Sequence, residues 1–287
     1  MKNIFKIIFL FAVLIGVTKL SAQDEKIENS TLWKIEGNGL TEASYLLGTI
    51  HVMCESDFVM KDKVVNALKE TSNLVLEIDF SDPEEIQALQ KTLMGDQPLS
   101  EIYSEDQIEK LDQLLKKTMN AGIESFDQFS IMAVYSMILQ KSISCPSVKM
   151  WEFELIALAN THEKEIKGLE KIERQAEFFN NAFPPDEMLE QLLIMDEYSD
   201  VFDLMVSTYN SEKITELGTV ISDPRFMNKN AEYWMLEYRN KNWLEKMPEM
   251  MKEESNLFAV GSAHLIGEFG LIPNLRALGY NVTPVFN

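Results

Sequence analysis

Short apolar runs near both ends of the chain predict buried strands. Runs at residues 31–35 and 44–47 flank Gly37-Asn38-Gly39, a combination typical of a β-hairpin. Further compact runs lie at residues 73–79, 165–169, 257–260 and 282–285. They are too compact for surface helices, so we expect one central sheet formed from N- and C-terminal strands. Pro284 favours an edge position, because proline cannot donate a ladder hydrogen bond.

Helical spacing dominates between about residues 82 and 250, interrupted by the strand expected near 165–169. Ser104 and Gln107 have the spacing of a capping box at the start of one of these helices. The pattern therefore predicts an α/β fold, in which one domain over residues 23–287 carries a large helical insertion.

The first residues have the composition of a targeting segment. Two lysines open the chain, an apolar run covers residues 7–17, and the small residues Ser21 and Ala22 follow it. This order predicts a signal peptide over residues 1–22, with a membrane anchor as the alternative. We expect an exported protein, periplasmic or secreted, without stable membrane insertion after the signal is removed.

The charge of the chain limits its partners. The formal net charge is −20, and the predicted signal carries three lysines and no acidic residue, so its removal leaves −23. A strongly acidic surface repels nucleic acids and anionic membranes. We therefore expect no nucleic-acid partner.

Two cysteines, Cys54 and Cys145, are present. An exported chain with an even number of cysteines can form one disulfide, although the sequence alone does not show that these two meet. The alternative is a nucleophilic pair of Cys54 with His51, which lies three residues earlier.

Two copies of a short motif use two of the three histidines of the chain. Gly48-Thr49-Ile50-His51 and Gly261-Ser262-Ala263-His264 each follow an apolar run that predicts a buried strand. A glycine at the end of a strand permits a sharp turn, so the histidine can lie over the carboxyl edge of the sheet, where α/β proteins usually bind ligands. The two imidazoles could share a metal ion.

Acidic residues end two other strands in the same way. Glu77 directly follows Leu74-Val75-Leu76, and Glu170 directly follows the run at residues 165–169. Each carboxylate could bind a metal ion, or could instead accept hydrogen bonds from the start of the next helix. Glu268, four residues after His264, is a further candidate.

The ordered set of motifs resembles the TraB/GumN family, which includes the Tiki metalloproteases. The segments that carry the resemblance are 45–51, 74–77, 168–170, 259–264, 270–272 and 279–285. Matches in the order expected of the family run from about residue 32 to 286. Phe269 departs from the pattern, since a positively charged residue is expected after Glu268.

The resemblance implies a metal-dependent hydrolase whose site gathers both motifs and acidic residues from strand ends. His51, Glu77 and His264 match the best-attested site positions of the family. Further matches are Glu170 in the Gly-Leu-Glu segment, Glu152 at a position where members often carry an acid, and Arg239 and Asn240 in a stretch that supplies an arginine and an asparagine.

The chemistry of these residues agrees with that implication. Imidazoles and carboxylates suit Mn, Co, Fe or Zn, so the cofactor is expected to be a divalent metal of undetermined identity. Glu77 is the candidate for ligand or general base, and Arg239 could stabilise an oxyanion or form a structural salt bridge.

The predicted function is an exported metal-dependent peptidase that cleaves peptides or N-terminal segments of proteins by activating water. A non-catalytic protein that binds or sequesters peptides or haem is the main alternative. A hydrolase acting on esters or other small molecules is a third.

Overall fold

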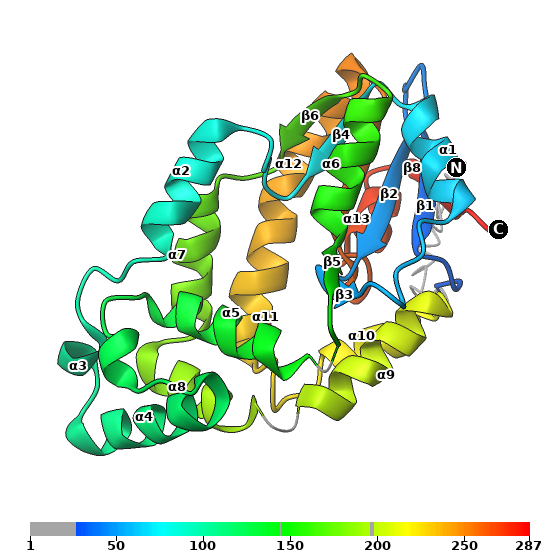
Figure 1. Ribbon diagram of the computed structural model, residues 1–287. Coiled ribbons are helices and arrows are strands. Elements are labelled where there is room, and N and C mark those ends of the chain that lie inside the picture. Colours follow the sequence, from blue (N-terminus) through cyan, green and yellow to red (C-terminus); the bar gives the residue numbers. More distant parts are fainter. Residues whose placement is uncertain (1–26, 144, 196–197) are drawn as a thin grey trace, which may run out of the picture.

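The computed structural model describes residues 27–287 except 144 and 196–197, so the predicted signal peptide lies outside the described residues. The fold is α/β, with a six-stranded sheet in the order β6-β4-β7-β2-β1-β8 (Figure 1). Its strands are β1 (Leu32–Gly37), β2 (Ser44–Thr49), β4 (Asn73–Leu76), β6 (Glu165–Gly168), β7 (Asn256–Gly261) and β8 (Tyr280–Pro284). The sheet thus combines strands from both ends of the chain, as predicted.

Strand β7 lies between β2 and β4 and is parallel to both. In this register Gly48 lies opposite Val260 and Thr49 opposite Gly261. The strands that carry the two Gly-x-x-His motifs are therefore direct neighbours. The predicted hairpin is confirmed by the antiparallel pairing of β1 with β2, and Pro284 lies in the edge strand β8.

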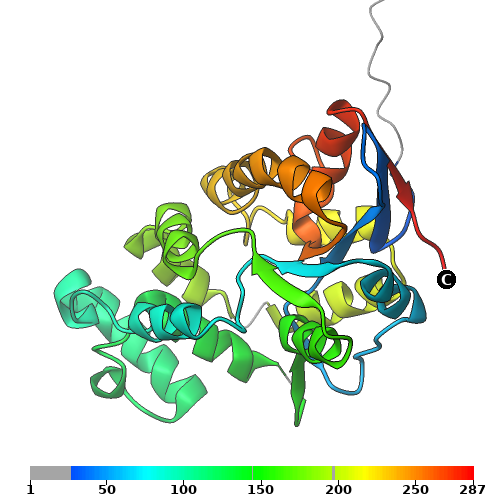
Figure 2. The same ribbon diagram turned by 90° about the horizontal axis from the view of Figure 1, so that it is seen from above.

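Helices cover both faces of the sheet (Figure 2). Leu74 and Leu76 join a hydrophobic cluster with α1 (Asp62–Glu70) and α6 (Trp151–Thr161). Val75, between them, belongs to a second cluster with α12 (Tyr238–Glu253) and α13 (Leu271–Ala277). This alternation arises because successive side chains of a strand point to opposite faces. Since both faces are buried, the strands read as continuous apolar runs.

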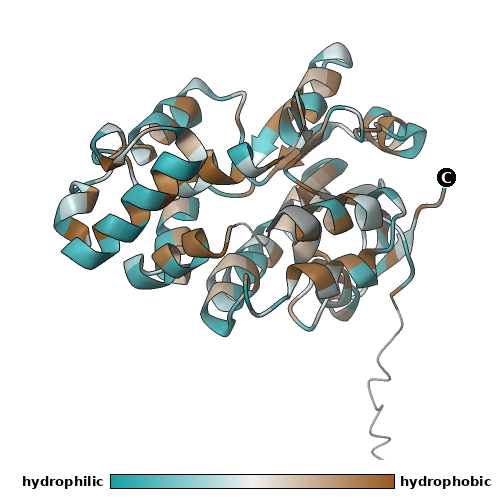
Figure 3. Cartoon of the chain, turned by 60° about the horizontal axis from the view of Figure 1, so that its bottom comes forward, coloured by the Kyte–Doolittle hydropathy of each residue, from teal (hydrophilic) through white to brown (hydrophobic). Residues whose placement is uncertain are grey.

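The helical insertion forms a lobe beside the sheet, with its own hydrophobic cluster around Leu111, Val134 and Leu189. Figure 3 shows hydrophilic and hydrophobic sides on its outer helices. The Ser104 backbone N–H donates to Gln107 Oε1 at 3.0 Å, as expected for a capping box. The remaining helices are α2 (Pro83–Thr92), α3 (Leu99–Ile102), α4 (Glu105–Met119), α5 (Ile131–Ser142), α7 (Ile172–Ala182), α8 (Pro185–Leu193), α9 (Tyr198–Asn210), α10 (Ile214–Ile221) and α11 (Lys229–Glu232).

A small second sheet was not predicted from the sequence. Strand β3 (Val52–Cys54) pairs antiparallel with β5 (Val148–Met150), so β5 interrupts the helical insertion in addition to β6. Three-residue strands are too short to show a recognisable alternation.

Cys54 and Cys145 form a disulfide that fastens this small sheet. The pairing that the sequence left open is thereby established, and the alternative of Cys54 as a nucleophile is wrong because its sulfur is bonded. Within the described part of the chain, none of the helices has the length and apolar character needed to cross a membrane.

Candidate functional site

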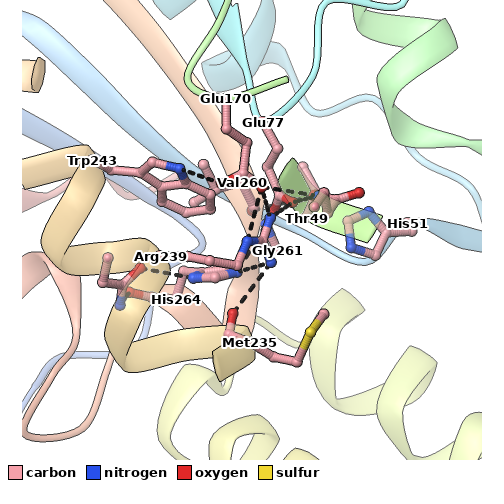
Figure 4. A network of polar contacts seen from close by, with 12 residues as sticks. Thr49, His51, Glu77, Glu170, Met235, Arg239, Trp243, Val260, Gly261 and His264 are labelled. Carbon is pink, nitrogen blue, oxygen red and sulfur yellow. Dashed lines mark hydrogen bonds and ion pairs between the residues drawn. The ribbon is translucent and has the colours of Figure 1, made fainter. Parts of the chain in front are cut away.

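The site lies at the carboxyl edge of the parallel strands, where the sequence placed it (Figure 4). His51 follows β2, Glu77 follows β4, and Glu170 lies two residues after β6. His264 ends a 3₁₀ turn, Ser262–His264, that directly follows β7. Arg239 reaches the same place from the first turn of α12. Segments far apart in sequence therefore meet because their strands are parallel and adjacent.

Gly261 leaves a small open space between three of these side chains. A methyl carbon placed on its Cα would lie 3.5 Å from Glu77 Oε1, 3.6 Å from His51 Nε2 and 3.6 Å from His264 Cδ2. His264 Nε2 and Glu77 Oε1 are 3.9 Å apart. Both imidazoles and one carboxylate thus border the same space.

Asn240 fixes the orientation and the tautomer of His264. Its amide nitrogen donates to the carbonyl oxygens of His264, at 3.1 Å, and Phe269, at 2.8 Å. Its oxygen is therefore the acceptor for His264 Nδ1, 2.7 Å away, so the proton of the neutral ring is on Nδ1. Burial and the charge of Arg239 lower the pKa of His264 to about 3, which keeps the ring neutral and its Nε2 an acceptor.

Glu152 holds the other imidazole. Its Oε1 lies 2.5 Å from His51 Nδ1, which leaves Nε2 of the ring facing the space beside Gly261. Desolvation lowers the pKa of His51, but the charge and hydrogen bond of Glu152 outweigh it and raise the pKa to about 9. Glu152 begins α6 directly after β5, and the Trp151 N–H donates to the His51 carbonyl at 3.1 Å. The small sheet therefore positions this pair.

Arg239 connects the two strand-end glutamates. Its Nη2 donates to Glu77 Oε2 at 2.5 Å and lies 2.7 Å from Glu170 Oε1, and its Nη1 donates to the Met235 carbonyl at 3.2 Å. Met235 belongs to a π-helical segment, Tyr233–Glu237, of the kind often found at functional sites. Burial alone would raise the pKa of Glu77, but Arg239 and the nearby histidines hold it far below its usual range.

Glu170 is a buried counter-ion of Arg239. Its Oε1 accepts from Arg239 Nε at 2.9 Å, and its Oε2 accepts from Trp243 Nε1 at 3.1 Å. Both oxygens are therefore used away from the space beside Gly261. The expectation that Glu170 is a metal ligand finds no support in this arrangement, whereas the structural salt bridge proposed for Arg239 is present.

The donor set beside Gly261 fits a divalent cation. Two ligands about 2.0–2.2 Å from one ion can be at most about 4.4 Å apart, so the 3.9 Å between His264 Nε2 and Glu77 Oε1 is compatible with a shared ion. Among the described residues, no group of three or more His, Cys, Asp or Glu side chains is already arranged to hold an ion. Arg239 Nη1 lies 3.1 Å from His264 Nε2, so ion binding requires this contact to open.

Glu268 was expected at the site but lies away from it, and Gln175 was not expected but belongs to it. Glu268 lies exposed in the turn after His264, away from the buried network, and its backbone carbonyl accepts from Asn274. Gln175 was missed: its Nε2 donates to Glu77 Oε2 and Glu170 Oε1, both at 3.2 Å. It lies on α7, and only its position five residues after Glu170 could have suggested this role.

The fold and the site define an α/β protein whose parallel-strand edge brings two histidines, three glutamates and an arginine together. The sequence model of the TraB/PrgY/gumN family matches residues 31–284, and the chain belongs to this family. Neither the curated proteins nor the solved structures contained a match to the chain.

Proposed function

We propose that this protein is a metal-dependent hydrolase that cleaves peptides, with His51, His264 and Glu77 as the ligands of a divalent cation. One observation carries the proposal: His51 Nε2, Glu77 Oε1 and His264 Cδ2, the ring carbon bonded to Nε2, border one small space, while each Nδ1 is held by another side chain. Metal-binding histidines in proteins are usually held in this way, because the second hydrogen bond fixes the tautomer and the ring orientation.

The roles of the side chains follow from their contacts. When bound, a divalent ion lowers the pKa of water and polarises a carbonyl group. Glu152 and Asn240 orient the two imidazoles. The pKa of Glu77 lies well below its usual range, which suits a ligand better than a general base, because a base works best when its pKa is near the working pH.

Arg239 supplies positive charge at the same place. Its guanidinium contacts both Glu77 and His264, so it lies beside the open space. A fixed cation there can stabilise the negative charge that develops on a carbonyl oxygen during hydrolysis. Because Glu170 also binds it, Arg239 can release His264 and still have a buried partner for its charge.

Elemental analysis tests the shared site first. The mature protein and the His51→Ala, His264→Ala double variant receive equal exposure to Mn, Co and Zn, and circular dichroism checks the fold. His162→Ala is the matched control, because this third histidine caps the end of α6 and lies outside the network. Near-stoichiometric metal is expected in wild type and control and little in the double variant. Equal binding by a folded double variant, or a metal-free wild type, would overturn the proposal.

Cleavage of a peptide library with and without chelator then tests the reaction. Chelator-sensitive cleavage that the double variant lacks is the expected result. Tight peptide or haem binding without turnover would favour the non-catalytic alternative instead. Export by a signal peptide is part of the proposal, because the substrates would then be peptides outside the cytoplasm.

A further inference from the structure

A pocket opens directly beside the candidate metal ligands. The volume of this cavity is about 330 Å³. Its wall includes His51, His264, Gly261 and Arg239, so the pocket and the proposed reaction centre share these residues. When a side chain of a ligand fills the pocket, the ligand bonds next to that side chain therefore lie beside the two imidazoles.

Most of the remaining wall is apolar and comes from the helical insertion. These apolar side chains come from the end of α7, from α9, α10 and the π-helical segment, and from the loop between α10 and α11. They include Phe183, Met205, Ile221, Met227, Met235 and Leu236. Methionine side chains are flexible and polarisable, so such a wall adapts to apolar groups of different shape.

The charges around the pocket disfavour ionised ligand groups. Among the described residues that line it, none is acidic, and Arg239 is already paired with Glu77 and Glu170. A lysine or aspartate side chain placed there would lose its hydration without gaining a partner. A leucine, methionine or phenylalanine side chain would gain the burial of its apolar surface.

We propose that this pocket binds one large apolar side chain of the substrate, adjacent to the bond that is cleaved. This proposal rests on the proposed function, because it names the substrate class of the same site. Because His51 and His264 are part of the pocket wall, the side chain in the pocket belongs to the substrate residue next to the scissile bond.

Peptides that differ at a single position next to the cleaved bond test the proposal. We expect kcat/KM to be similar for leucine, methionine and phenylalanine, and to fall by about 10- to 100-fold for alanine. Aspartate should be cleaved more slowly still. Equal kcat/KM across the series would overturn the pocket assignment while leaving the proposed function intact.

A matched pair of variants on α9 places the preference in this pocket. Met205→Glu adds a carboxylate to the pocket wall, so it should reduce kcat/KM for the leucine peptide at least tenfold and improve the lysine peptide relative to it. Leu204→Glu adds the same charge to the neighbouring side chain, which is 51% exposed and outside the pocket, and should leave both values unchanged. Identical effects of the two variants would contradict the assignment.

A binding measurement keeps the pocket testable without turnover. In protein labelled at the methionine methyl groups, the leucine peptide should shift the NMR signals of Met205 and Met227, and the aspartate peptide should not. If no peptide is cleaved but these shifts occur, the proposed function fails, and with it the position next to a cleaved bond, while the preference of the pocket for an apolar side chain stands. Absence of the shifts with the leucine peptide would overturn the pocket assignment.

Discussion

Replacing Gly261 by alanine should separate ion binding from folding. The backbone at Gly261 has φ −55° and ψ 138°, a conformation open to any residue, and its N–H would still donate to Glu77 Oε1. The new methyl group would meet its neighbours at 3.5–3.6 Å, which is ordinary van der Waals contact. The unfolding free energy should therefore stay the same or rise by about 0.4–1 kcal/mol, the usual gain when an unstrained glycine becomes alanine.

Ion affinity should fall in the same variant, because the methyl group fills the space that His51, His264 and Glu77 share. Mutation of the groups that only orient metal ligands already weakens metal binding by about 10- to 100-fold. We expect at least a tenfold loss, about 1.4 kcal/mol, in calorimetric titration with Zn or Co.

Gly48→Ala is the contrasting variant from the other motif. Its methyl group would lie 2.9 Å from Ser262 Oγ and 3.0 Å from Leu265 Cδ2, inside the packed core. It should lower the unfolding free energy by about 1–3 kcal/mol, measured in urea, with little change in ion affinity of the folded protein. The reasoning would be refuted if folded Gly261→Ala bound the ion as tightly as wild type.

Three further predictions concern the framework of the site. Glu170→Gln should lower the unfolding free energy by about 3 kcal/mol in urea denaturation, because Arg239 would keep a buried charge with one partner fewer; no measurable loss would contradict the counter-ion role. Reducing the disulfide should lower the unfolding free energy by about 2–4 kcal/mol and shift the pKa of His51 down from about 9, as followed by NMR titration, because the small sheet that positions its carboxylate partner would loosen. Glu212 accepts hydrogen bonds from Lys61 and Lys63, and these outweigh the effect of burial and lower its pKa. Its stabilising contribution is therefore present above the ordinary glutamate pKa of about 4.3 and is lost as the pH falls further, so wild type and Glu212→Gln should converge in unfolding free energy in acid; a constant difference would argue against it.

The sequence predicted the sheet and the meeting of its strand ends for clear physical reasons. Strands buried on both faces are compact and apolar throughout, so residues 73–79 and 257–260 were recognisable without knowledge of their partners. Parallel strands end at one edge, so His51, Glu77 and His264 were expected to meet.

The partners of these residues were not predictable in the same way. The contact of Glu152 with His51 depends on two three-residue strands and a disulfide, which leave almost no periodic signal. Whether Glu170 faces an ion or an arginine depends on how α12 packs against the sheet, which places Arg239 and Trp243 beside it. Tertiary packing, rather than local pattern, determines these contacts.

The position of β7 has a consequence for synthesis of the chain. This strand pairs with β2 on one side and β4 on the other, although it is made more than 170 residues after both. Until residues 256–261 leave the ribosome, β2 and β4 each have an unpaired edge, and such late, long-range pairing makes folding slow. If the predicted signal peptide directs the chain across a membrane, translocation can begin well before the sheet is able to close.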